Sequence, residues 1–368
     1  MNWLSILAGV VLVFWALRDI YLTIFYPSSS PSILSLSVGR GMWQLFRLAV
    51  SLRGIDRDRL ISHGGPMLLV IIFVIWIMLP ISGFALICWP GLGSSIQAND
   101  QKTSTTFITA LYYSAYTFTT LGIGPLIPKT DIYRLLTILE TSLGFASFSL
   151  TITYFLSVFN ALTKRNTFAL KLQYLTGAKA NAAEMIALLG ANGDFNGVRQ
   201  EISTIATNSL NLLESHHTYP ILHYFRFQKP YYSLARIALL TMDTATLLKS
   251  AINQEKYRSL VHSAAVTELE SGSLYMLQQL SDSFLPQKFL AGEAQPEREW
   301  RQWYYYSVKR LQAEGIHTTP NLEAGADCYV SLRRRWNPYV VGFADYMMYK
   351  WSEIAPAPEN FDFCKFSR

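Results

Sequence analysis

The stretch TFTTLGIGPLIP, residues 117–128, decides the fold, because it sets threonines and glycines between two long apolar runs. The first run, residues 66–89, has no charged residue, and the second, residues 132–162, has only Arg134 and Glu140. At about 1.5 Å per helical residue, each is long enough to cross a bilayer core of roughly 30 Å. A non-helical backbone between such spans has to line water or be buried in protein, because hydrocarbon cannot satisfy its polar groups.

The segment before this stretch predicts a short re-entrant helix. Residues 105–118 are apolar but too few to cross a bilayer. Glycines at 122 and 124 permit left-handed dihedrals at every second residue, which turns successive carbonyls toward the same side. Four such strands around an axis form stacked rings of oxygens that replace the water shell of a cation, and Thr120 adds a hydroxyl ring at the inner end.

These residues resemble a known family. The run ALYYSAYTFTTLGIGPLIP, residues 110–128, is similar to the pore helix and selectivity filter of tetrameric pore-loop potassium channels, with their T-x-T-T-V-G-Y-G-D pattern and a proline three residues later. The positions that match in register are Thr117, Thr119, Thr120, Gly122, Gly124 and Pro128. The resemblance is to the two-transmembrane-type pore module of bacterial ion channels. It implies an outer helix at 66–89, a pore helix at 105–118, a filter at 119–125 and an inner helix at 132–162.

The resemblance also implies roles for individual residues. The filter that binds permeant K⁺, with no other cofactor or metal, is Thr120, Leu121, Gly122, Ile123 and Gly124. The residues that support the filter are Thr119, Tyr112, Tyr113, Tyr116, Pro125 and Glu140. Gly144 lies where the family often has its gating hinge, and close packing explains a glycine there equally well.

Three departures weaken the filter's expected support. Ile123 replaces the family's tyrosine, Pro125 replaces its acidic residue and removes a backbone donor, and Tyr116 stands where many members have a glutamate. The buried charge of Glu140 must face protein or water, either as a structural contact or as a titrating gate. These departures leave a weakly selective cation channel as an alternative to a potassium-selective one.

Arginines fix the expected orientation. The N-terminal helix, residues 1–26, is read as a span with a surface helix as the alternative, and residues 27–64 form a basic amphipathic linker. The arginines of this linker are Arg40, Arg47, Arg53, Arg57 and Arg59. By the positive-inside rule the linker and the C-terminal half are cytoplasmic in a multi-pass protein of the plasma membrane, or of the inner membrane if the cell is bacterial. The same arginines are candidates for contact with anionic lipids, although a plain orientation signal explains them equally well.

Residues 164–368 read as a cytoplasmic all-helical regulatory domain of five to eight helices with an unknown effector. Apolar residues at helical spacing occur at residues 257–265 and again at Trp300, Tyr304, Val308 and Leu311. His216, His217 and His223 come at irregular spacing beside aromatics, which favours packing over metal binding.

The fold class is therefore an all-α membrane protein with a pore module of 65–163, an extra N-terminal helix and a helical domain. We expect a homotetramer, since one filter segment supplies a quarter of each oxygen ring and the chain has one copy. The function expected is passive potassium conduction gated by the inner helix and cytoplasmic domain, with a non-conducting membrane receptor as an alternative of another class. No nucleophile and base arrangement suggests an enzyme, and a surplus of three positive charges in each half is no nucleic-acid signature.

Overall fold

The computed structural model divides the chain into two compact units. The described residues are 2–26, 33–50, 57–99, 102–122, 124–290 and 296–356. The first unit, here called the membrane unit, comprises residues 1–160 together with 218–225. The second, the helical unit, comprises residues 161–217 and 226–368.

Three helices are long and apolar enough to cross a membrane: α1 (Asn2–Phe25), α4 (Gly64–Cys88) and α6 (Asp131–Leu175). All three expected spans are thus helices, and α4 continues through Pro80 without ending. Neighbouring groups inside a span can satisfy the hydrogen bond that such a proline removes.

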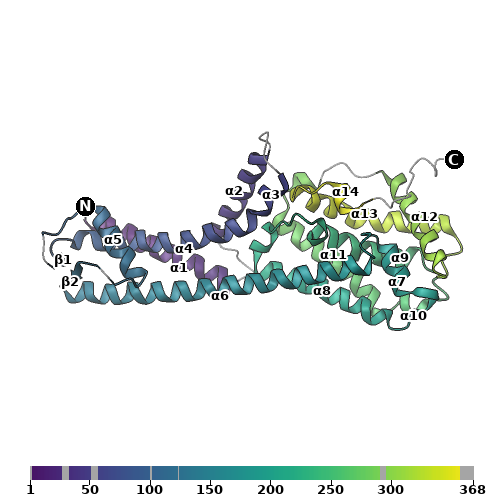
Figure 1. Ribbon diagram of the computed structural model, residues 1–368, viewed down its shortest axis with the longest axis horizontal. Coiled ribbons are helices and arrows are strands. Elements are labelled where there is room, and N and C mark those ends of the chain that lie inside the picture. The colour runs from purple at the N-terminus through teal and green to yellow at the C-terminus, as the bar shows by residue number, and fades with distance from the viewer. Residues whose placement is uncertain are drawn as a thin grey trace. The chain divides into compact units, whose positions relative to one another are not determined.

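Helix α1 lies along α4 (Figure 1). Their backbones approach closely at a pair of glycines, since a Cβ added at Gly9 would come within 2.4 Å of the Gly83 carbonyl oxygen. Small residues permit this kind of close packing between membrane helices. The Trp76 indole nitrogen also donates to the buried Asp19 carboxylate at 2.8 Å. Both contacts fit α1 as a helix packed lengthwise within the membrane unit.

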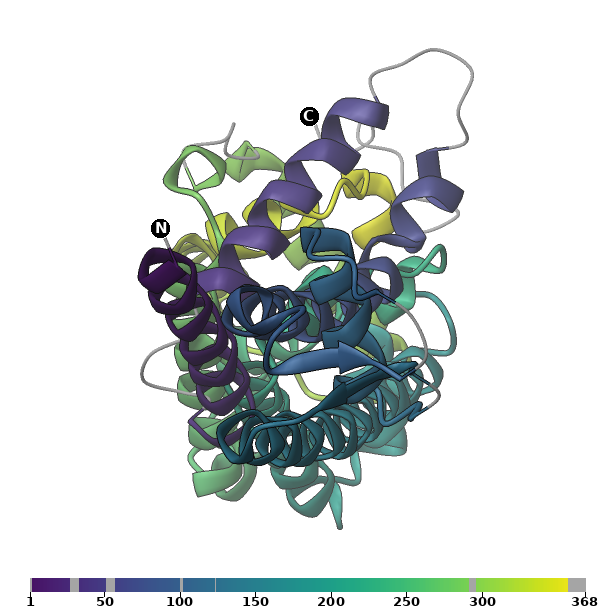
Figure 2. The ribbon, with the colours of Figure 1, turned by 90° about the vertical axis from the view of Figure 1, so that its left-hand side faces the viewer.

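The segment between α4 and α6 contains the short helix η1 (Trp89–Gly91), strand β1 (Ile96–Ala98), helix α5 (Phe107–Phe118) and strand β2 (Leu126–Pro128). The strands pair antiparallel, with Gln97 opposite Ile127, and Figure 2 shows them as two adjacent arrows. Helix α5 begins two residues later than expected, because the Thr106 hydroxyl caps it by accepting from the Thr109 N–H. The sheet ties the chain after the filter stretch to the chain before α5.

The inner helix is longer than the sequence pattern predicts. It runs unbroken from Asp131 to Leu175 instead of ending at residue 162. No proline or glycine interrupts residues 145–175, and Gly177, at φ +57°, follows the end. The charges at 164 and 165 mark the end of the apolar run and not of the helix.

The linker contains helices α2 (Ile33–Val50) and α3 (Arg57–Ser62). In α2, Trp43 is buried whereas Leu45 and Leu48 are exposed. The boundary expected at residue 163 is incomplete, because 218–225, including helix η3 (Pro220–Tyr224), belong to the membrane unit. Aromatic side chains account for this placement, since the Tyr224 ring lies 5.9 Å from that of Trp43.

The helical unit begins with the end of α6. Its other elements are α7 (Ala182–Leu189), η2 (Ala191–Gly193), α8 (Val198–Thr218), η4 (Pro230–Tyr232), α9 (Leu234–Ser250), α10 (Arg258–Val261), α11 (Ala264–Phe284), η5 (Gln287–Phe289), α12 (Glu297–Ala313), α13 (Leu322–Tyr346) and α14 (Trp351–Ile354). Helix α9 is buried along nearly its whole length and packs against α7, α11 and α13. It is therefore the centre of this unit's core.

One helical pattern in this unit is confirmed and another is wrong. The face of α12 made by Trp300, Tyr304, Val308 and Leu311 is buried, as its spacing predicts. Residues 257–265 do not form one helix, because the Ser263 hydroxyl accepts from the Val266 N–H and starts α11 after α10 has ended.

Candidate functional site

The pore helix α5 ends in a hydrogen-bonded turn that launches the filter stretch. Thr120 N–H bonds to the Thr117 carbonyl at 3.1 Å, and Leu121 N–H bonds to the Tyr116 carbonyl at 2.9 Å. This pair of bonds is the Schellman pattern, which places a left-handed residue just after a helix. Thr120 is that residue, with φ +58°. A β-branched residue seldom adopts this conformation, so its presence marks a functional candidate.

Left-handed backbone begins earlier than the glycines predict. Between residues 117 and 122 it occurs at Thr120, which ends the helix, and at Gly122 (φ +67°). These two positions are two residues apart, the spacing that the sequence predicts. Thr120, Leu121 and Gly122 are exposed in the single chain, and Leu121 is 59 % exposed. Ile123 lies outside the described residues.

Tyr116 supports residues 124–126, which include the last filter residue and are here called the filter arm. A Cβ at Gly124 would come within 1.9 Å of the Tyr116 ring, so only glycine allows this contact. The Tyr116 hydroxyl donates to the Leu126 carbonyl at 2.8 Å, and the Pro125 carbonyl accepts from Asn99 N–H at 3.1 Å. The arm is thus held by both packing and hydrogen bonds, although Pro125 itself has no N–H to donate.

The other aromatic candidates form one cluster with Tyr116. The ring centroids of Tyr112 and Tyr113 lie 5.2 and 5.5 Å from that of Tyr116. Tyr113 is buried and its hydroxyl donates to Thr137 on α6 at 2.6 Å, because the Thr137 proton already goes to the Tyr133 carbonyl. Tyr112 is partly exposed, and the Thr119 hydroxyl turns back to the Ala115 carbonyl at 2.7 Å. The pore helix is therefore tied to the inner helix through Tyr113.

Glu140 lies on the one face of α6 that is buried within the chain. This face contains Glu140, Gly144, Ser147, Thr151, Tyr154 and Val158. A Glu140 carboxylate oxygen is hydrogen-bonded to Ser114 of α5, whose hydroxyl also lies 2.9 Å from the Ile81 carbonyl of α4. Ser114 thereby joins three helices. Sequence reasoning missed it, and the signal that could have found it is a lone serine within an apolar 14-residue run.

Gly144 allows α6 to approach the end of the pore helix. A Cβ added there would come within 1.9 Å of the Phe118 carbonyl oxygen, a backbone atom that cannot move aside. The contact gives this glycine a packing role whether or not it also acts as a hinge.

The linker arginines differ in exposure. Arg40 and Arg59 are exposed, Arg47 and Arg57 are partly buried, and Arg53 lies outside the described residues.

This arrangement suits a cation. The C-terminal end of a helix carries a partial negative charge, and α5 presents that end to the filter stretch. A backbone that is exposed, glycine-containing and short of side-chain donors offers mainly carbonyl oxygens to an ion.

Comparisons with known proteins agree with this geometry. Residues 67–161 match the family model described as "Ion channel", a family of two-transmembrane pore-loop channels. The chain is 26 % identical over 317 residues to an uncharacterized membrane protein, YdjJ, of Bacillus subtilis (strain 168), and the match covers 86 % of each chain. No solved structure matches it. Residues 67–161 of this membrane protein form a pore module of the ion-channel family.

Proposed function

We propose that the protein is a homotetrameric, potassium-selective channel that conducts passively through the backbone of residues 120–124. The observation that carries the proposal is the exposed, left-handed segment at Thr120 and Gly122, set at the negative end of α5 between two spans. One chain supplies one such strand, so a closed ring requires four copies around an axis. The permeant K⁺ ions are the only ions the site requires.

Selective conduction is favoured over weak selectivity by Tyr116. Selectivity depends on the number and position of the carbonyls, and these need support when Ile123 and Pro125 replace the family's polar residues. The ring of Tyr116 against Gly124 and its bond to Leu126 supply support from behind.

Gating is proposed to pass through two connections to the helical unit. One is the continuous helix α6, which runs from the pore module into that unit. The other is segment 218–225, which packs within the membrane unit yet is continuous with the helical unit at both of its ends. A Cβ added at Gly65, at the start of α4, would come within 2.7 Å of the Phe225 ring, so this contact is close. A movement of the helical unit therefore has two covalent routes to the pore.

The proposed topology places the arginine-rich linker and the helical unit in the cytoplasm and residues 91–131 outside. The positive-inside rule supports it, since the linker holds five arginines and residues 91–106 hold only Lys102. Arg40 and Arg59 are exposed, as contact with anionic headgroups at the inner surface requires.

The test is a bi-ionic flux assay on purified protein in liposomes, with potassium inside and sodium outside. We expect a potassium diffusion potential that Gly122→Ala abolishes, because alanine is strained at φ +67°. Gly41→Ala is the matched control, since Gly41 is exposed and an added Cβ would meet no atom within 4 Å.

Each outcome is informative. Equal passage of both ions, lost in Gly122→Ala, would replace potassium selectivity by weak cation selectivity. Absence of flux from the wild-type protein, with assembly intact, would favour a non-conducting receptor.

A further inference from the structure

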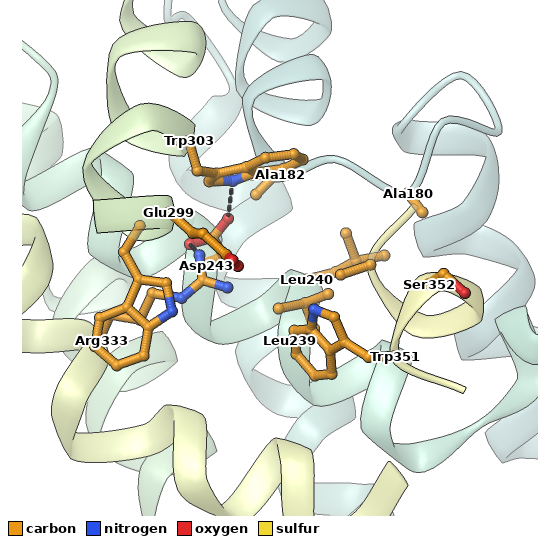
Figure 3. Close-up of a pocket in the computed structure, with 12 residues that line it drawn as sticks. Ala180, Ala182, Leu239, Leu240, Asp243, Glu299, Trp303, Arg333, Trp351 and Ser352 are labelled. Carbon is orange, nitrogen blue, oxygen red and sulfur yellow. Dashed lines mark hydrogen bonds and ion pairs between the residues drawn. The ribbon is translucent and has the colours of Figure 1, made fainter. Parts of the chain in front are cut away.

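A cavity in the helical unit lies between α7, α9, α12, α13 and α14, far in sequence from the pore module (Figure 3). Its volume is about 210 Å³. Its polar lining comes from Asp243, Glu299 and Arg333, and its apolar lining includes Leu239, Leu240 and Trp351. Ser352 is exposed and marks an opening to the surface.

Arg333 is a buried cation with donors left over. Its side chain is 5 % exposed, and its Nε donates to Asn337 at 3.2 Å. Its Nη1 donates to the Tyr329 hydroxyl and lies 3.5 Å from Asp243. Its Nη2 makes no hydrogen bond with any described residue, and Figure 3 shows the guanidinium turned toward the cavity. Nη2 is thus an open donor at the wall of the cavity, and it points to a ligand that accepts from it.

Asp243 does not compete with such a ligand for the Nη2 group of Arg333, because both Asp243 oxygens already accept hydrogen bonds from other side chains. Oδ2 accepts from the Trp303 indole at 3.1 Å, and Oδ1 accepts from Tyr329 at 2.6 Å and faces Arg333. The charge of Asp243 therefore offsets that of Arg333, but the Nη2 hydrogens still have no acceptor among the described residues.

Glu299 brings a negatively charged carboxylate to the same cavity as the positively charged Arg333. It lies on the first turn of α12, is partly buried, and forms no ion pair with Arg333 in the described structure. In Figure 3 Glu299 lies near Asp243 and Trp303, and its carboxylate points toward the middle of the cavity. A carboxylate that lines a cavity near indole faces favours a cation, since both attract positive charge.

We propose that this cavity binds a small zwitterion, an α-amino acid with an aliphatic side chain. Its carboxylate accepts from Arg333 Nη2, its ammonium donates to Glu299, and its side chain packs against Leu239, Leu240 and Trp351. The pairing uses both the Arg333 Nη2 donor and the Glu299 carboxylate, whereas a simple amine or a simple acid uses only one of them.

The size of the cavity agrees with this class. A dry cavity of about 150 Å³ accommodates benzene in an engineered protein. A cavity of about 210 Å³ therefore has room for a branched aliphatic amino acid.

The test is binding of L-leucine to the full-length protein in detergent, measured by calorimetry and by the shift in unfolding temperature. The probes for comparison are 3-methylbutylamine, which lacks the carboxylate, and 4-methylpentanoic acid, which lacks the ammonium. We expect leucine to bind at least about tenfold more tightly than either, because the amine leaves the Arg333 Nη2 donor without an acceptor and the acid leaves the Glu299 carboxylate unpaired.

Two variants test the site, and one serves as the control. Glu299→Gln is expected to reduce leucine affinity at least about tenfold without weakening binding of the acid, which no longer lies beside a like charge. Ser352→Trp fills the mouth and is expected to abolish binding. Glu297→Gln lies on the same turn of α12 but pairs with Arg334 and does not line the cavity, so it should bind as wild type does.

Binding of either analogue as tightly as leucine, or no binding of leucine at millimolar concentration, would overturn the proposal. Regulation of ion flux by the amino acid rests on the proposed channel function, whereas the binding measurement needs no flux. The site and the pore can therefore fail separately.

Discussion

At the scale of single residues, Gly124 and Gly144 show that the pore module packs so closely at two positions that only glycine fits. Gly124 accepts the Tyr116 ring, and Gly144 accepts the Phe118 carbonyl. Both contacts involve α5, which is therefore held at its end by the filter arm on one side and by α6 on the other. The sequence alone leaves Gly144 open to a hinge or a packing role, and the two roles predict different effects of the same substitution.

Gly144→Ala is expected to lower the unfolding temperature of the protein in detergent and to reduce flux. The added Cβ would meet Phe118 O at 1.9 Å, and overpacking of this kind costs about 1–3 kcal/mol. A role as a hinge alone predicts the reverse for stability, since alanine favours a helix over glycine by about 1 kcal/mol. Gly41→Ala, in an open helical position, should leave the unfolding temperature unchanged or raise it. A stable Gly144→Ala with reduced flux would thus reject the packing role.

His216 predicts a pH dependence of the helical unit. Burial of the ring and the charge of Arg165 lower the pKa of His216 to about 3, against the opposing effect of a bond to the Leu212 carbonyl, and His217 adds a smaller decrease. Between the unfolded value of about 6.5 and about 3, the unfolded chain binds the proton and the folded chain does not. Stability is therefore complete above about pH 6.5 and falls with pH below it, by up to about 1.4 kcal/mol per unit.

The measurement compares unfolding temperatures at about pH 7.5 and 5. Wild type and His217→Gln should lose stability on acidification, and His216→Gln should lose less. An equal loss in all three proteins would show that His216 does not contribute.

At the scale of elements, the spacing and length of apolar runs were enough to predict the helices. They were not enough to predict where each helix ends or which distant segments it contacts. The three long helices, α5 and the buried face of α12 follow from apolar spacing. The extension of α6 to Leu175 was missed, because charged residues end an apolar run without ending a helix. The Schellman turn at Thr120 was missed, because glycines were taken as the left-handed positions.

Segment 218–225 could not be assigned from sequence, since its aromatic run resembles any buried loop. Its partners lie 160 to 185 residues earlier, at Gly39, Trp43 and Gly65, and one sequence does not reveal such pairs. For Glu140 the sequence predicted a contact with the pore helix, which is confirmed, but not its partner there, Ser114.

Tyr224→Ala tests segment 218–225 as a coupling element. The substitution removes the ring that packs on Gly39 and Trp43, so we expect the open–closed equilibrium to shift by about 0.5–2 kcal/mol, or about 2- to 30-fold. The ratio of potassium to sodium permeability should not change, because the filter is untouched. Single-channel recording in planar bilayers measures both quantities. Tyr275→Ala, which removes a ring that is 52 % exposed in α11, is the control. A changed permeability ratio, or an unchanged equilibrium, would argue against coupling through this segment.

At the scale of the whole molecule, the apolar surface of α6 indicates what the assembled protein must cover. Outside its buried stripe the helix exposes Ile132, Leu135, Ile138, Leu139, Phe145, Ile152, Leu156 and Phe159. Lipid can cover such a surface, but lipid cannot satisfy the exposed backbone of residues 120–122. A water-filled axis shared by several copies satisfies both requirements, and the number of copies is then a measurable property.

Subunit mixing counts these copies. Gly122→Ala and wild-type chains, differently tagged, are co-expressed at equal amounts, reconstituted and assayed for potassium flux. If one strained filter strand disables a ring, the flux falls to about one sixteenth for four copies and to about one quarter for two. Flux is then proportional to the fourth or the second power of the wild-type fraction, and measurement at several mixing ratios distinguishes the two. Gly41→Ala chains should mix without loss, since nothing contacts that position. A flux that falls linearly with the mutant fraction would mean that each chain conducts alone, and the tetramer would have to be abandoned.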